Sequence, residues 1–242
     1  MEPPLAFNGR SVRDEKVHVL DAVQHIQGDA VRTSTTRGQY GPGWVSGEEV
    51  AGYRQEADVA PESRTETFVA LKLCIDTWRW ADVPFYLRTG KRMPKRSTEI
   101  AIQFKRAPHL LFRDVVDVAA LEPNILTMRI QPNEGISLRF HTKVPGSPVR
   151  IRAANMDFLY GASFLMQAPS AYETLLLDAL RGDNTLFARA DEVEAAWSIV
   201  DDIVEGWQET PAAEFPNYEA GTWGPREAEE LIERDGREWR RL

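Results

Sequence analysis

The sequence predicts an α+β domain in which helices pack on one face of a large, mostly antiparallel β-sheet. The middle of the chain consists of short segments rich in β-branched and aromatic residues, separated by turn signals such as residues 131–135. No helical pattern of roughly ten residues or more connects one of these segments to the next, so parallel crossovers are not expected. The last third of the chain instead carries apolar residues at helical spacing. Strands followed by helices are typical of the α+β class.

The predicted strands are short, and one of them shows a clear alternation. Apolar Ile136, Leu138 and Phe140 alternate with polar residues, which predicts a sheet with one covered face. The predicted strands cover residues 65–75, 85–89, 98–105, 125–131 and 136–143.

Helices are predicted near both ends of the chain. Ser11 is the expected N-cap of a helix that runs to about residue 25. Residues 38–61 are expected to form a long ordered loop with a short helix near residues 47–53. The later helices are expected over residues 169–180, from Asp191 onward, and from about Pro225 to Arg240. No repeat and no linker divides the chain, so we predict one domain over residues 1–242.

Composition and charge exclude several classes of protein. The formal net charge of −8 disfavours nucleic-acid binding, because dedicated nucleic-acid binders are usually basic. No apolar run approaches the roughly 18 residues that span a bilayer, and the first residues do not resemble a signal peptide. Cys74, the only cysteine, lies in an apolar run and is expected to be an inert core thiol. A reducing, cytoplasmic setting fits this cysteine usage best.

Residues 83–96 are the segment around which we expect a site. An apolar strand is followed by five cations within nine residues, interrupted by Gly90 and Pro94. These cations are Arg88, Lys91, Arg92, Lys95 and Arg96. Such a turn holds positive charge at a sheet edge, where it could grip a small anion. The alternative is a solvated basic loop, which is the usual meaning of a charge run.

The sequence carries no recognisable catalytic apparatus. Residues 41–47 are rich in glycine but lack the spacing and the preceding strand of a dinucleotide-binding turn, and there is no phosphate-binding loop. The histidines are isolated in sequence, so we expect surface or structural roles for each of them and no metal site. They are His18, His25, His109 and His141. Taken alone, the residues predict half of a binding site.

Several segments together resemble the C-terminal domain of the glucose-6-phosphate dehydrogenase family, in the family's order and spacing over nearly the whole chain. The motifs that carry the resemblance lie at residues 12–17, 37–40, 79–80, 83–91, 129–134, 171–173, 176–178 and 218–225. The last of these, with Gly221, Trp223 and Gly224, resembles the bacterial branch of the family.

The resemblance implies a large antiparallel sheet backed by helices, which builds a homodimer or homotetramer. The family oxidises glucose 6-phosphate to 6-phosphogluconolactone with NADP, in the pentose phosphate pathway. Its N-terminal Rossmann half, with a G-x-x-G-D fingerprint and the catalytic histidine, has no counterpart in these 242 residues. We therefore expect a fragment or the product of a truncated reading frame, inactive by itself. The alternative is a non-catalytic assembly or sugar-phosphate-binding module with the same fold.

The resemblance also implies site residues. Lys91 and Arg96 match the family's substrate contacts, and Gln131 matches a further sugar-contacting glutamine of some members. Lys95 is the rival of Arg96 for the second position. No catalytic residue and no metal ligand is implied in this chain.

Some relatives bind a second, structural NADP in this domain, and the resemblance covers that site only in part. Arg88, Arg129 and Asp157 match its residues. Where basic residues are expected, the chain instead has Ser97, Ala101 and Trp223. We therefore do not expect a structural NADP.

Overall fold

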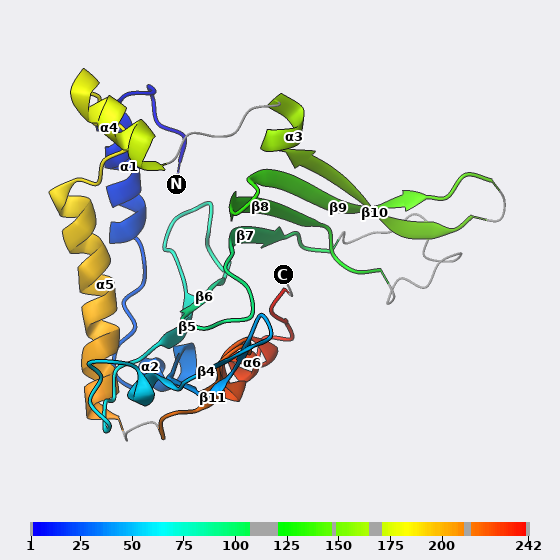
Figure 1. The fold of residues 1–242 in the computed structure, drawn as a ribbon. Coiled ribbons are helices and arrows are strands. Elements are labelled where there is room, and N and C mark those ends of the chain that lie inside the picture. The colour runs from blue at the N-terminus through cyan, green and yellow to red at the C-terminus, as the bar shows by residue number, and fades with distance from the viewer. Residues whose placement is uncertain (1, 107–120, 147–148, 165–170, 211–213, 241–242) are drawn as a thin grey trace. The chain divides into compact units, whose positions relative to one another are not determined.

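The computed structural model of the chain describes residues 2–106, 121–146, 149–164, 171–210 and 214–240 (Figure 1). Its internal contacts group the chain into two compact units. The first unit comprises Met1–Pro94 and Ser170–Trp239, and the second comprises Lys95–Pro169 and Arg240–Leu242. The assignment of residues 1–242 to a single domain stays a prediction.

The first unit is built on an antiparallel sheet of three strands in the order β1-β5-β6. These strands are β1 (Thr35–Gly38), β5 (Phe68–Leu73) and β6 (Phe85–Gly90). The segment predicted as a long loop contains β2 (Tyr40–Gly41), β3 (Gly43–Val45), β4 (Glu48–Val50) and the 3-10 helix η1 (Tyr53–Gln55). The strands β3 and β4 pair antiparallel, and β2 pairs in parallel with β11 (Tyr218–Glu219).

Helices cover both faces of the three-stranded sheet. Val69, Leu71 and Leu73 of β5 pack against a core cluster that includes Val31 of α2 (Asp29–Ser34) and residues Ile203 and Trp207 of α5 (Ala190–Glu209). Phe68 and Ala70 face the other way, into a cluster with Ala228 and Leu231 of α6 (Arg226–Glu233). This differs from the predicted packing on one face. The physical reason is that β5 is apolar or half-buried along both of its faces, so each face needs a cover.

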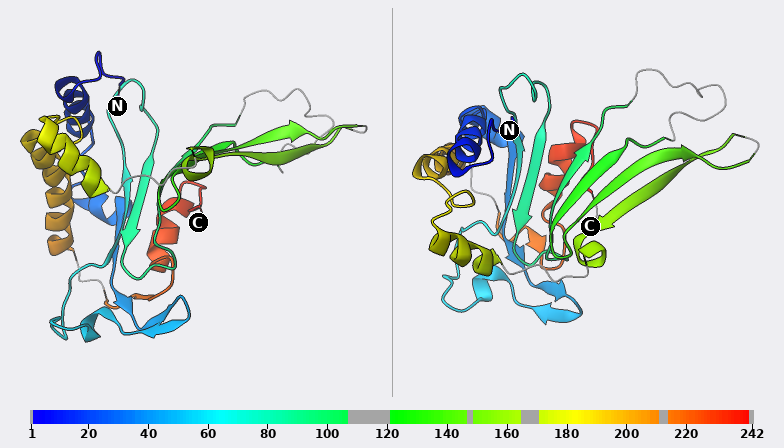
Figure 2. Two further views of the ribbon diagram at one scale, coloured as in Figure 1. Left: turned by 45° about the horizontal axis from the view of Figure 1, so that its top comes forward. Right: turned by 90° about the horizontal axis from the view of Figure 1, so that it is seen from above.

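The ends of the helices differ from the predictions in ways that the local contacts explain. Helix α1 (Gly9–Asp21) packs beside α5, as Figures 1 and 2 show. Its N-cap is Asn8, whose side chain accepts a hydrogen bond from the Ser11 amide, so the prediction of Ser11 as the cap is wrong. The helix stops before residue 25 because Val23 forms a bridge with Ile75. Helix α4 spans Ala171–Arg181, close to its predicted range.

The last helix also ends earlier than predicted, at Glu233 rather than Arg240. The residues that follow fold back, and the Trp239 indole donates a hydrogen bond of 2.7 Å to the Ala228 carbonyl.

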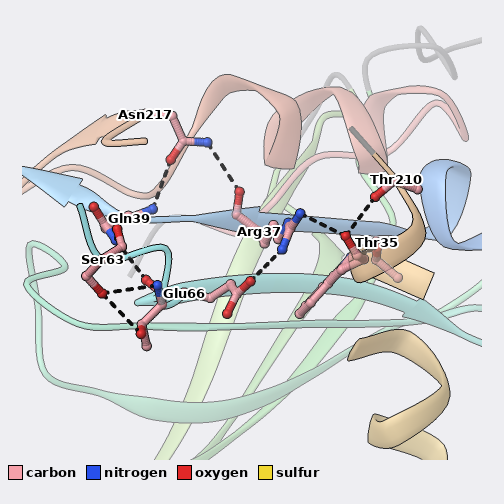
Figure 3. A network of polar contacts seen from close by, with 9 residues as sticks. Thr35, Arg37, Gln39, Ser63, Glu66, Thr210 and Asn217 are labelled. Carbon is pink, nitrogen blue, oxygen red and sulfur yellow. Dashed lines mark hydrogen bonds and ion pairs between the residues drawn. The ribbon is translucent and has the colours of Figure 1, made fainter. Parts of the chain in front are cut away.

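Residues 37–40 take part in a network of polar contacts that connects β1 to distant segments of the first unit (Figure 3). The Arg37 guanidinium contacts Glu66 at 2.7 Å and the Trp207 carbonyl at 3.1 Å. The Asn217 side chain accepts from the Gln39 amide and donates to the Arg37 carbonyl. This motif, one of those that carry the family resemblance, therefore fastens the strand rather than lining a site.

The second unit is an antiparallel meander of four strands in the order β10-β9-β8-β7. These strands are β7 (Thr98–Gln103), β8 (Ile125–Gln131), β9 (Gly135–Lys143) and β10 (Ile151–Leu159), and the helix α3 (Tyr160–Phe164) follows them. Strand β10 is not predicted from the sequence, because its alanine, asparagine and aspartate residues have low strand propensity. Strands β1 and β11 are likewise absent from the predicted set. The predicted α+β class with antiparallel strands is confirmed, although the strands divide into separate sheets.

The meander has one apolar face, which runs across all four strands. The strand registers place Ile100, Met128, Ile136 and Phe158 in one row. Met156 belongs to the next row, with Ile102, Leu126 and Leu138. This apolar face is partly open to solvent, since Ile100 is 51% exposed and Met156 is 62% exposed. The predicted alternation in residues 136–143 is thus present, and it extends over the whole sheet.

Candidate functional site

The basic segment leaves the end of β6 as an exposed loop. Strand β6 ends at Gly90, and the side chains of Lys91, Arg92, Lys95 and Arg96 all lie on the surface. A Cβ atom at Gly90 would lie 2.7 Å from the Phe68 ring, closer than side-chain atoms approach one another. The glycine therefore lets the loop pass directly over the core of the first unit.

The backbone of Lys91 is held on both sides. Its amide donates to the Thr67 carbonyl at 2.8 Å. Its carbonyl accepts from the hydroxyl of Tyr218 at 3.0 Å. The base of the Lys91 side chain is consequently fixed to the core, while its ammonium end reaches solvent.

Arg92 is tied to neighbouring segments as well. Its carbonyl accepts a hydrogen bond of 2.7 Å from the Gly221 amide. Its guanidinium contacts Glu56 at 2.8 Å, and the Tyr40 hydroxyl donates to the same carboxylate oxygen at 3.0 Å. The Arg92 guanidinium, and then the Tyr40 hydroxyl, lower the pKa of Glu56 below its ordinary value. Arg92 therefore anchors the loop to a neighbouring segment of the first unit.

Arg96 and Gln131 belong to the second unit, whereas Lys91 belongs to the first. Gln131 is the last residue of β8 and pairs in register with Thr98, two residues after Arg96. The Gln131 side-chain amide donates to the Thr98 hydroxyl at 3.1 Å. The structure thus brings Gln131 and Arg96 to the same end of the β7–β8 pair. Lys95 lies beside Arg96 on the same exposed stretch.

The residues that match a structural NADP site make contacts with other side chains of the chain. The Arg88 guanidinium lies between two indoles, 4.9 Å from the Trp223 ring centre and 4.7 Å from that of Trp239. Arg88 also lies 3.7 Å from the Glu229 carboxylate, so its charge is already engaged. In the second unit Arg129 pairs with Asp157 at 3.6 Å. The absence of a structural NADP stays a prediction.

The cysteine and the histidines that the structure describes do not gather into a further site. Cys74 is half-buried at the end of β5, and its carbonyl accepts from Gln24. His25 pairs with Asp202, and His18 lies 3.6 Å from Glu15, while His109 falls outside the described residues. Within the described ranges no cluster of His, Cys, Asp and Glu side chains could hold a metal ion. No helix in that part of the chain is long and apolar enough to cross a membrane.

Comparison with known proteins decides the family. The family model described as "Glucose-6-phosphate dehydrogenase, C-terminal domain" matches residues 1–240. The chain belongs to the glucose-6-phosphate dehydrogenase family. Glucose-6-phosphate 1-dehydrogenase of Chlamydia pneumoniae is 48% identical over 243 residues, covering 100% of this chain and 47% of the relative. That of Mycolicibacterium smegmatis is 50% identical over 240 residues, covering 99% of this chain and 48% of the relative. The chain thus spans about half the length of these relatives.

Solved structures give the same result. A glucose-6-phosphate dehydrogenase in complex with its substrate glucose 6-phosphate superposes with a TM-score of 0.84 at 33% identity, covering 100% of this chain and 48% of that one. The enzyme from Mycobacterium avium superposes with a TM-score of 0.80 at 32% identity, covering 100% and 47%. The resemblance inferred from the motifs is confirmed.

Proposed function

We propose that the chain is the substrate-binding and assembly half of an NADP-dependent glucose-6-phosphate dehydrogenase, acting in the cytoplasm. The observation that supports this most is the anchored basic loop, within a chain that matches the family over its whole length. Lys91 and Arg96 would hold glucose 6-phosphate through charged hydrogen bonds, and Gln131 would contact the sugar. The cation of Lys91 is presented from a rigid backbone, as positioning of a substrate requires.

The reaction transfers a hydride from the C1 carbon of the sugar to NADP, and a base removes the C1 hydroxyl proton. The described residues provide anion-binding groups for this step. The base and the nicotinamide site belong to the other half of the relatives' length in this proposal. No second, structural NADP is part of it, because Trp223 and Trp239 enclose Arg88.

We expect turnover only when both halves are present. The test uses a fusion of this chain to the N-terminal half of the 50% identical Mycolicibacterium smegmatis relative. This fusion is called the joined protein. Hydride transfer needs a base and a bound nicotinamide in near-contact geometry, so the 242-residue chain alone should reduce no NADP. The appearance of NADPH absorbance in the presence of glucose 6-phosphate measures turnover by the joined protein and by the chain alone.

The two results that contradict this proposal are distinct. Turnover by the chain alone, above a heat-killed control, would refute the assignment of the base and the nicotinamide site to the other half. A folded joined protein that binds NADP but neither binds nor oxidises glucose 6-phosphate would instead favour the non-catalytic module.

We further infer that the apolar face of the meander pairs two subunits, as a dimer or within a tetramer. This face presents large side chains from four strands on one side of the sheet, and exposed apolar surfaces of this kind mark interaction sites. A two-fold axis would place the same face of each subunit against the other.

Met156→Lys should shift the chain from dimer to monomer at micromolar concentration, because it introduces a charge into the apolar face that forms the proposed interface. Met156 is 62% exposed, so the fold of the unit should survive. The matched control is Asn155→Lys, which places the same charge on the opposite face of β10 and should leave the dimer intact. Sedimentation velocity measures the oligomeric state of both variants. A wild-type chain that sediments as a clean monomer, or two variants that behave alike, would contradict the assignment of this face.

A further inference from the structure

Tyr218 connects the basic loop to the core through its hydroxyl group. It lies in β11, next to β2, and only 7% of its surface is exposed. Its hydroxyl oxygen lies 3.0 Å from the Lys91 carbonyl and 3.1 Å from the Thr67 hydroxyl. The Thr67 carbonyl is further away, at 3.4 Å.

The direction of these hydrogen bonds follows from the groups at the two ends. The Tyr40 amide can only donate, and it lies 3.0 Å from the Thr67 hydroxyl oxygen. The Lys91 carbonyl can only accept. The Thr67 hydroxyl therefore donates to Tyr218, and Tyr218 donates to Lys91. This sequence of bonds, here called the hydroxyl chain, runs from Tyr40 through Thr67 and Tyr218 to Lys91, and each bond polarises the next.

The hydroxyl chain keeps these hydrogen-bond directions at neutral pH. Burial raises the pKa of Tyr218 above its ordinary value, so the phenol keeps its proton and remains a donor. Meanwhile the Lys91 amide donates to the Thr67 carbonyl at 2.8 Å. Both backbone polar groups of Lys91 thus depend on Thr67 and Tyr218, although the lysine side chain itself is exposed.

The ring of Tyr218 has a separate role in packing. Its centre lies 5.6 Å from that of Phe68 and 6.4 Å from that of Tyr40. Replacing the tyrosine with phenylalanine keeps these ring contacts and removes only the hydroxyl. The two roles can therefore be separated by one substitution.

We propose that Tyr218 is a positioning residue for the substrate, acting through the Lys91 carbonyl to set the place from which the Lys91 ammonium reaches the anion. The inference rests on the proposed role of Lys91 as a substrate contact. In this proposal Tyr218 affects substrate binding without contacting the substrate, through its hydrogen bond to the Lys91 carbonyl.

Tyr218→Phe in the joined protein is expected to raise the KM for glucose 6-phosphate about 3- to 10-fold, the effect of one lost hydrogen bond, with kcat changed less than twofold. The matched control is Tyr86→Phe, which removes a hydroxyl bonded to Asp235 from the strand that leads to Lys91. The control should leave KM unchanged. Melting temperatures of both variants report their stability, which a purely structural role would move without a selective change in KM.

The double variant Lys91→Ala/Tyr218→Phe separates the possible results. If Tyr218 acts through Lys91, then Tyr218→Phe adds nothing to KM once Lys91 is alanine. An effect that persists in that background, or a KM unchanged by Tyr218→Phe while Lys91→Ala raises it, overturns the positioning role alone. If Lys91→Ala leaves KM unchanged, the proposed substrate contact fails, and this inference fails with it.

Thr67→Val serves where Tyr218→Phe does not fold, because it interrupts the hydroxyl chain one step earlier with a side chain of similar shape. It should raise KM by a smaller factor than Tyr218→Phe, because the Tyr218 hydroxyl can still donate to the Lys91 carbonyl, with kcat again unchanged. An unchanged KM would overturn the proposal.

Discussion

Lys91→Ala in the joined protein is expected to raise the KM for glucose 6-phosphate about 10- to 100-fold. The physical reason is the loss of a charged hydrogen bond, worth roughly 1.5–3 kcal/mol, and about 1.4 kcal/mol corresponds to a factor of ten. Arg96→Ala should have an effect of the same order. Lys91→Arg should be less damaging than Lys91→Ala but should not restore the wild-type constant, since a planar guanidinium does not replace a compact ammonium.

Lys95→Ala is the matched control for these variants. Lys95 is an exposed cation of the same loop, next to Arg96, and its loss should change KM little. Arg92→Ala is unsuitable as a control, because Arg92 contacts Glu56 and thereby fastens the loop. If Lys95→Ala proves as costly as Arg96→Ala, the assignment of the substrate contact to Arg96 rather than Lys95 is wrong. Equal and small effects for all of these cations would mean that the segment is a solvated loop.

Gly221→Ala is expected to unfold the first unit or to lower its free energy of unfolding by more than about 4 kcal/mol, a loss beyond that of most single substitutions. Gly221 has a φ angle of +85°, and an added Cβ would lie 1.8 Å from the Trp44 carbonyl oxygen. That oxygen is a backbone atom of β3 and cannot turn aside. The Gly221 amide also holds the Arg92 carbonyl at 2.7 Å, so the basic loop should loosen as well.

Gly47→Ala isolates the cost of the backbone conformation. Gly47 has nearly the same φ angle, +86°, in the turn between β3 and β4, but nothing lies within 4 Å of its Cβ position. Gly47→Ala should therefore cost only about 1–3 kcal/mol. Urea unfolding of the two variants, followed by circular dichroism, gives the difference that belongs to the close approach. Equal losses would show that the contact with Trp44 relaxes without cost.

The basic loop shows how far the sequence leads toward the site. A strand followed by a glycine and several cations predicts positive charge at a sheet edge, and the structure places the segment at the end of the edge strand β6. The pattern does not distinguish Arg92 from Lys95, since both are exposed cations of one loop. Their difference comes from Glu56, which is 36 residues away from Arg92 in the chain. Thr67 gave no signal of its own, because a threonine at the start of a strand is ordinary.

The sequence by itself determined the family, the α+β class, the strands β5 to β9 and the segment that carries the charge, because these follow from local propensity, period and motif order. Only the tertiary structure decided what each charged or polar residue does. Arg88 is enclosed by two indoles rather than offered to an anion, and the backbone of Lys91 is held by Tyr218, 127 residues away in the chain. Such partners are brought together by packing of the core, and no local pattern of residues specifies them.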